Sequence, residues 1–156
     1  MKMETGLSAD TRQLISDKLA HLLADTYLVY VQTQNCHWNL IGKEFYEIHI
    51  LLDKQYHELV EPIDEIAERI RALGFYVDAS LVSFQNMSKL KEIRQIMTEH
   101  EGLESLLANQ EAVVRNARQT CTFADSHADH ATVDMLGRFT GFMEKSAWMV
   151  RSQLNR

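Results

Sequence analysis

Hydrophobic side chains recur every three to four residues along most of this 156-residue chain, a pattern that predicts a protein built almost entirely of α-helices. The clearest stretch begins near Gly42. We expect it to end at Gly74, because glycine readily adopts the left-handed conformation that follows many helices. Pro62 should kink or loosen this helix, because its ring displaces the hydrogen bond to Glu58. The apolar positions that share one face of the helix are Phe45, Ile48, Leu52, Tyr56, Leu59, Ile63, Ile66 and Ile70.

Three further helices are predicted around this one. Ser8 is a candidate N-cap for a first helix that reaches about Trp38, and Ser88 for a third helix over residues 89 to about 120. A fourth helix is expected from residue 131 to 154. The apolar positions of the first helix are Leu14, Ile15, Leu19, Leu22, Leu23, Tyr27 and Tyr30, and those of the third are Leu90, Ile93, Ile96, Met97, Leu103, Leu106, Leu107, Val113 and Val114.

The helical pattern breaks from residue 75 to about residue 88. These fourteen residues can span roughly 46–50 Å when extended, which is about the length of a 30-residue helix. A connection of that length between the second and third helices is what a ferritin-like bundle requires, and the segment ASLVSF within it can form a short helix. We predict an all-α, ferritin-like four-helix bundle with a long crossover, forming one domain over residues 1–156 with a short N-terminal tail at 1–8.

Composition is consistent with one globular domain, since 46% of the residues are hydrophobic and the chain has one proline. No run approaches the ~20 apolar residues of a membrane helix, and the first residues lack the apolar segment of a signal peptide. We therefore expect a cytoplasmic protein with no membrane partner. The spacing of Cys36 and Cys121 gives neither a disulfide framework nor a thiolate metal site, and we assign them no chemistry.

A polar stripe beside the apolar face of the second helix carries the candidate chemistry. It contains two pairs spaced four residues apart, His49 with Asp53 and Asp64 with Glu68, so that the side chains of each pair meet above one helical turn. Imidazole and carboxylate without thiolate suit Fe(II), Mn(II) or Zn(II). A single acidic residue or histidine on a helix flank is usually just solvated. Four in register favour a metal site.

One helix cannot close both pairs on the same ion. At ~1.5 Å rise per residue, Asp53 and Asp64 are roughly 16 Å apart along the axis, and His49 and Glu68 roughly 28 Å. A second copy of the helix, packed antiparallel about a two-fold axis, would place His49 and Asp53 of one chain opposite Asp64 and Glu68 of the other. No Glu-x-x-His occurs in the sequence, so the di-iron arrangement inside a single bundle cannot form. The metal site therefore requires an oligomer.

The segment HWNLIGKEFYEIH, which ends at His49, together with Asp53 and the following DEIAER, resembles the signature of the Dps family, the mini-ferritins. The resemblance implies a ferroxidase centre between subunits. In that centre His37, His49 and Asp53 come from one chain, and Asp64 and Glu68 come from its two-fold partner. His37 precedes the second helix, so helix geometry alone does not identify it.

The resemblance also implies a function. Fe(II) would bind at the subunit interfaces of a homododecamer, be oxidised, usually by hydrogen peroxide, and be stored as a ferric (Fe³⁺) mineral that protects against oxidative stress. The two histidines would be neutral donors, Asp53 and Glu68 charged anchors, and Asp64 a ligand or a bridge to a second iron. Trp38 is similar to the family's tryptophan near the iron site, with simple aromatic packing as the alternative.

Acidic and histidine residues crowd the segment FADSHADHATVD before the fourth helix. The family has acidic residues near here along three-fold pores, where converging carboxylates would draw Fe(II) inward. Asp129 and Asp134 are the candidates for such a pore, and capping of the helix start is the alternative. His127 and His130 depart from the all-acid expectation.

Two other function classes are alternatives. Some family members compact DNA through lysine-rich N-terminal tails, but the first eleven residues here carry Lys2 against Glu4 and Asp10, and the net charge is −6. Phosphate binding needs clustered Lys or Arg, so the sequence disfavours direct DNA binding. In the other alternative the stripe is a coincidence and the chain is a helical interaction protein, active in surface adhesion or immune recognition.

Overall fold

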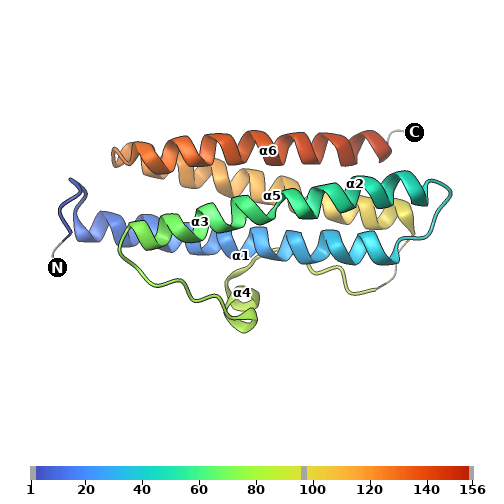
Figure 1. Ribbon diagram of the computed structural model, residues 1–156, viewed down its shortest axis with the longest axis horizontal. Helices are drawn as coiled ribbons and strands as arrows, with labels where there is room; N and C mark the ends of the chain where they lie inside the picture. Colours follow the sequence, from blue (N-terminus) through green and yellow to red (C-terminus); the bar gives the residue numbers. More distant parts are fainter. Residues whose placement is uncertain (1–2, 96–97, 155–156) are drawn as a thin grey trace.

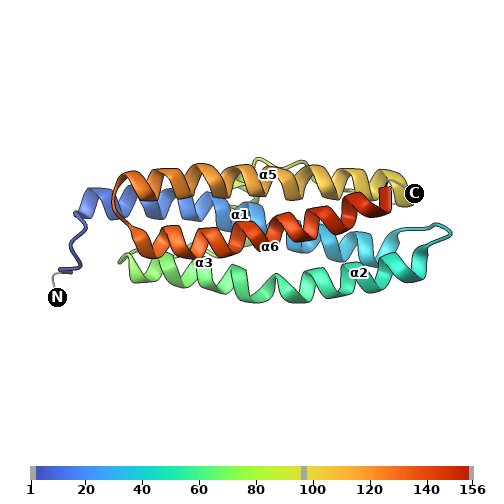
Figure 2. The same cartoon turned by 90° about the horizontal axis from the view of Figure 1, so that it is seen from above.

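The computed structural model describes residues 3–95 and 98–154, and over these residues it contains six α-helices and no β-strand. Four long helical segments lie side by side (Figure 1, Figure 2). They are α1 (Ala9–Asn39), α2 (Phe45–Glu58) followed by α3 (Val60–Ala72), α5 (Glu99–Ser126) and α6 (His130–Leu154). The short helix α4 (Leu81–Met87) lies in the connection between α3 and α5. The predicted all-α bundle with a long crossover is confirmed; Lys2, Ile96 and Met97 lie outside the described residues.

The hydrophobic core lies between the four segments. Its largest fully buried side chains are Ile15, Leu19, Leu22, Ile48, Leu52, Ile66, Ile70, Leu73, Leu103, Leu106, Leu136 and Met143. Two positions expected in the core are not there, since Leu14 is 50% exposed and Phe45 is 42% exposed. Leu14 lies about 100° from the buried face formed by Ile15, Leu19 and Leu22, and Phe45 is the first residue of α2. No helix in the described part of the chain is long and apolar enough to cross a membrane.

The two predicted signals at the ends of the first and second helices are confirmed. The Ser8 side chain accepts a hydrogen bond from the Thr11 amide at 3.1 Å and caps α1. Gly74 adopts φ +98° after α3. The amide of Phe75 then donates to the carbonyl of Ile70 at 3.2 Å, which satisfies a backbone acceptor at the helix end.

The second long helix is interrupted at Leu59, three residues before Pro62. Proline has no N–H to donate to the carbonyl of Glu58, so the regular ladder loses one bond there. The Leu59 amide still donates to Gln55 at 3.2 Å, and the ladder resumes with Ile63 donating to Leu59 at 3.1 Å. The predicted loosening of this helix is therefore confirmed, and it divides the helix into α2 and α3 (Figure 2).

The third bundle helix begins about ten residues later than predicted. Thr98, and not Ser88, caps it, because Thr98 and Glu101 form a reciprocal capping box. Ser88 instead ends α4, and residues 89–95 follow without regular secondary structure. The helix also continues beyond Thr120, to Ser126. The crossover is correspondingly longer than the predicted segment, although the short helix expected within it is present as α4.

Polar side chains fasten the crossover to the bundle. Asp25 of α1 is buried and accepts from the hydroxyl of Ser88 at 2.7 Å, from the amide of Lys89 at 3.1 Å and from Asn116 of α5 at 2.9 Å. Further along, Gln32 of α1 and Asn109 of α5 both donate to the carbonyl of Lys91, at 2.9 and 2.8 Å. These bonds satisfy the backbone of a segment that has no helical ladder of its own.

We predict that Asp25→Ala lowers the free energy of unfolding by about 2–3 kcal/mol, because it removes a buried charged acceptor and leaves its donors unpaired. Denaturant unfolding followed by circular dichroism measures the change. Asp17→Ala is the matched control, since Asp17 is exposed and accepts one bond, from Gln13 at 2.7 Å; it should change the free energy by less than about 0.5 kcal/mol. Equal effects of the two variants would contradict the fastening role of Asp25.

Candidate metal centre

His37 near the end of α1 and His49 of α2 hold one another in place. Their rings stack with centroids 3.8 Å apart and planes 16° from parallel. The Nδ1 of His37 lies 2.9 Å from the carbonyl oxygen of His49, and the Nδ1 of His49 lies 2.9 Å from the carbonyl oxygen of His37. A carbonyl oxygen only accepts, so each Nδ1 carries the hydrogen, and in the neutral ring each Nε2 keeps its lone pair. Such backbone bonds are typical of metal-binding histidines.

Asp53, one turn after His49, lies beside the histidine pair. Its Oδ1 is 3.9 Å from Nε2 of His37 and accepts a 3.0 Å hydrogen bond from the hydroxyl of Tyr56. Its Oδ2 is 3.6 Å from Nδ1 of His57, which also lies 2.9 Å from the Asp53 carbonyl oxygen. The carboxylate is half-exposed and therefore accessible to an ion.

Tyr56 and His57 contact Asp53, although neither is among the site residues predicted from the sequence. Tyr56 was assigned to the core face, yet its ring also packs edge-on against His37 with centroids 5.3 Å apart. Partial burial and the hydrogen bond to Asp53 raise the pKa of the Tyr56 hydroxyl, which stays a donor at neutral pH. The sequence spacing could have identified both residues, since residues three and four positions after Asp53 lie on the same side of the helix.

Asp64 and Glu68 do not join the other three candidates. Both lie on α3 with exposed side chains, and within the described residues neither forms a hydrogen bond or an ion pair. In the part of the chain that is described, no three His, Cys, Asp or Glu side chains are arranged to hold one metal ion. A single protomer thus presents a histidine and carboxylate cluster at one place and two unpartnered carboxylates at another.

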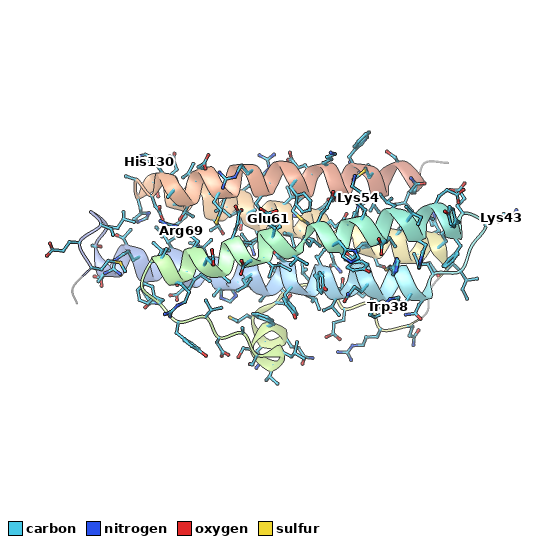
Figure 3. All side chains as sticks on the ribbon, in the orientation of Figure 1. Trp38, Lys43, Lys54, Glu61, Arg69 and His130 are labelled. Atoms are coloured by element: carbon cyan, nitrogen blue, oxygen red, sulfur yellow. The ribbon has the colours of Figure 1, made fainter. Side chains whose placement is uncertain are left out.

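Exposed apolar side chains lie among the candidate ligands. Tyr46 is 71%, Ile50 52% and Val60 54% exposed. With His49 as reference and ~100° per residue, these three fall at about 60°, 100° and 20°, the sector that also holds the polar stripe. Trp38, at the end of α1 beside α2, is 64% exposed (Figure 3). A surface that mixes large apolar groups with ligand-type groups is typical of a protein interface.

Asp129 is buried within the protomer. It is 3% exposed and forms a 2.6 Å ion pair with Arg69 of α3. It also caps α6, accepting from the amide and hydroxyl of Thr132. Burial alone would raise the pKa of Asp129, but the hydrogen bonds from Arg69 and Thr132 outweigh it and hold that pKa below its ordinary value. Within the protomer the carboxylate therefore caps α6, as the alternative predicted, and a pore role for Asp129 between subunits stays a prediction.

The remaining charged and histidine residues of this segment are exposed, except for His127, which is half-buried. Asp134 is exposed and pairs with Arg138. His127 has Nδ1 2.8 Å from the carbonyl oxygen of Phe123, a contact that holds it to the end of α5. His130 is exposed at the start of α6, at the same end of the bundle as Arg69 (Figure 3). A pore role for Asp134 stays a prediction.

Neither cysteine adds a ligand to the candidate centre. Burial raises the pKa of Cys36 to about 12, so it is a thiol at neutral pH, and the thiolate is the form that binds metals. Cys121 is half-buried, with its sulfur 3.9 Å from the carbonyl oxygen of Val133.

Known proteins resemble this chain over nearly its whole length. The model of the ferritin-like domain matches residues 16–156. An uncharacterized low temperature-induced protein of Nostoc is 36% identical, with 97% of this chain and 86% of the relative covered. A DNA protection during starvation protein of Porphyromonas gingivalis is 29% identical, with 94% and 92% covered. The Dps protein of Vibrio cholerae, described as a ferritin-like diiron-carboxylate protein, has a TM-score of 0.92 at 27% identity, with 99% and 98% covered.

We predict that Asp129→Asn destabilises the fold by about 1–3 kcal/mol at neutral pH, because it removes the charged partner of Arg69 and weakens the cap of α6. A carboxylate with a lowered pKa stabilises the folded state above its unfolded pKa, ~3.9, and this contribution disappears as the pH falls through the folded value. Unfolding curves between pH 7 and pH 2 should therefore converge for the variant and the parent at the acid end. Asp134→Asn, which removes an exposed pair, should cost at most about 1 kcal/mol. A constant difference between the Asp129 variant and the parent at every pH would contradict the assignment.

Proposed function

This chain belongs to the Dps family of ferritin-like proteins, and on that premise we propose that it is a ferroxidase that oxidises Fe(II) between two subunits and stores the product as ferric mineral. The family supports iron storage and protection. The finer proposal is that the subunits form a homododecameric shell and that hydrogen peroxide is the preferred oxidant. Iron enters this reaction as substrate.

The reciprocal histidine contact is the observation that carries this proposal. It directs the Nδ1–H groups of His37 and His49 to backbone carbonyls, which leaves both Nε2 atoms free to donate a lone pair, and that of His37 lies 3.9 Å from Asp53. Two histidines and one carboxylate form half of an iron site of borderline donors. Asp64 and Glu68 supply the remaining carboxylates if a second copy packs antiparallel against α2 and α3. The exposed apolar residues in the same sector fit burial at that contact.

The charge of the donor set suits oxidation of iron. The completed site would combine two neutral imidazoles with the carboxylates of Asp53, Asp64 and Glu68. Electrostatic stabilisation by these carboxylates increases when the ion charge rises from two to three, so they favour loss of an electron. Each hydrogen peroxide takes one electron from each of two Fe(II) ions and two protons from solvent, and it leaves as two waters. Tyr56 holds Asp53 in place through its hydrogen bond.

Storage would follow from enclosing the product. Ferric ion is poorly soluble near neutral pH, and a closed shell of subunits would keep the mineral inside. Consumption of Fe(II) and peroxide together removes both reactants of hydroxyl-radical formation. This accounts for protection of the cell without contact between protein and DNA.

The sharpest test exploits the shared site. We predict that His49→Ala and the double variant Asp64→Ala, Glu68→Ala each lose rapid Fe(II) oxidation by peroxide while still assembling. When the two are dissociated, mixed in equal amounts and reassembled, roughly a quarter of the sites become wild-type, because half of the random two-fold pairs are mixed and each of these restores one site of two. Absorbance of ferric product measures the initial rate.

Each variant reassembled by itself is the control and should stay inactive. Size-exclusion chromatography checks that every sample forms the same assembly. If the mixture recovers no activity although mixed assemblies form, the site is not shared between subunits in the proposed way. If either variant alone keeps the full rate, the ligand assignment is wrong.

The name of the Porphyromonas gingivalis relative, DNA protection during starvation protein, makes direct DNA contact the second candidate. With a net charge of −6, we expect this chain to give no shift of duplex DNA in a gel at low salt. A shift that weakens steeply as salt is raised would instead support the DNA-binding alternative.

A further inference from the structure

A pocket on the crossover side of the bundle is lined by positive charge. It has a volume of about 370 Å³ and lies between α1, α5 and the residues that follow α4. Figure 1 shows the crossover returning along the bundle beside α1. The charged and polar residues that line it are Lys18, His21 and Asp25 of α1, Lys89 of the crossover, and Arg115, Asn116, Gln119 and Thr120 of α5. The pocket is separate from the candidate metal centre, whose residues are not among them.

The three cations of this pocket are not neutralised by other side chains. Lys18, Lys89 and Arg115 form no ion pair with any described residue, whereas Arg118, one turn along α5, pairs with Glu144. The ammonium of Lys18 lies 4.6 Å from the centre of the Phe123 ring, a contact that positions the group but leaves its charge uncompensated.

Asp25 is the one acidic residue that lines the described pocket, and its oxygens are already occupied. Oδ1 accepts from Ser88 and from the amide of Lys89, and Oδ2 accepts from Asn116. These bonds hold Asp25 in place and fix the backbone of Lys89 next to the pocket. Apart from His21, the lining residues carry three positive charges and one negative charge. A local excess of positive charge in a chain of net charge −6 indicates an anion site.

We propose that this pocket binds a phosphate group, either free orthophosphate or the phosphate of a nucleotide. Lysine and arginine from three separate elements can approach a tetrahedral dianion from several sides, and charge-assisted bonds of this kind are the strong ones. Gln119, which is exposed, offers a further donor. His21 has Nδ1 3.1 Å from the carbonyl oxygen of Met87, which anchors its ring at the pocket. The volume is in the range of small-ligand pockets and exceeds what a bare phosphate needs.

The test measures binding to the assembled, iron-free protein by isothermal titration calorimetry, with orthophosphate and adenosine monophosphate as separate probes at constant ionic strength. We expect saturable binding with one site per chain. Arg115→Gln and Lys18→Gln should each weaken it by about tenfold, the effect of losing one charge-assisted bond. Arg118→Gln is the matched control, because it removes the same charge from the same helix outside the pocket, and it should change the affinity by less than about twofold.

The two probes distinguish the source of the phosphate. Tighter binding of the nucleotide assigns the extra volume to its nucleoside, and equal affinities assign the site to free phosphate. The proposal is overturned if neither probe saturates, or if Arg118→Gln weakens binding as much as Arg115→Gln, since the effect would then be general surface charge. Because no iron is present, these outcomes are independent of the ferroxidase proposal.

Discussion

The mutual hydrogen bonds of His37 and His49 are the interaction on which the candidate centre depends. Each ring donates to the backbone of the other residue, so the end of α1 and the start of α2 are held together by the same two residues that supply the nitrogen donors. The short connection between these helices has no regular pattern of backbone hydrogen bonds. The stacked histidine rings hold the two helix ends together instead. The contact between His37 and His49 therefore both joins the two helices and orients the two nitrogen donors.

The crossover is fixed by a second polar contact of the same kind. Asp25 is buried below a segment that makes few backbone bonds with itself, and it takes hydrogen bonds from that segment and from α5. Because the crossover is anchored there, Lys89 is placed opposite cations of α1 and α5. The bundle thus carries an acidic polar surface on α2 and α3 and a basic pocket on its crossover side. The crossover therefore places the basic pocket on a different side of the bundle from the acidic surface of α2 and α3.

Much of the fold could be predicted from the sequence because its signals are local. The helical spacing of apolar residues predicted where the helices lie, and Ser8 and Gly74 predicted two of the helix ends. The start of α5 was misplaced because a serine at position 88 resembles a cap, whereas the competing Thr98 and Glu101 box lay inside the predicted helix. The burial of Asp129 could not be predicted, because its partner Arg69 is sixty residues away. For the centre, spacing identified four candidates on one helix and family resemblance added His37. The contact of Tyr56 with Asp53 follows from their spacing on one helix, whereas its contact with His37 of α1 could not be predicted without the packing of the two helices.

The candidate site constrains how many residues can separate Asp53 of α2 from Asp64 of α3, across the interruption at Leu59. Each residue inserted or deleted at the joint between α2 and α3 would rotate one helix relative to the other by about 100° and shift it by ~1.5 Å. Such a change would turn Asp64 and Glu68 away from the side that bears His49, and it would also turn the buried Ile66 and Ile70 of α3 away from the core. The length of the joint therefore decides whether the two pairs of candidate ligands face the same side of the bundle.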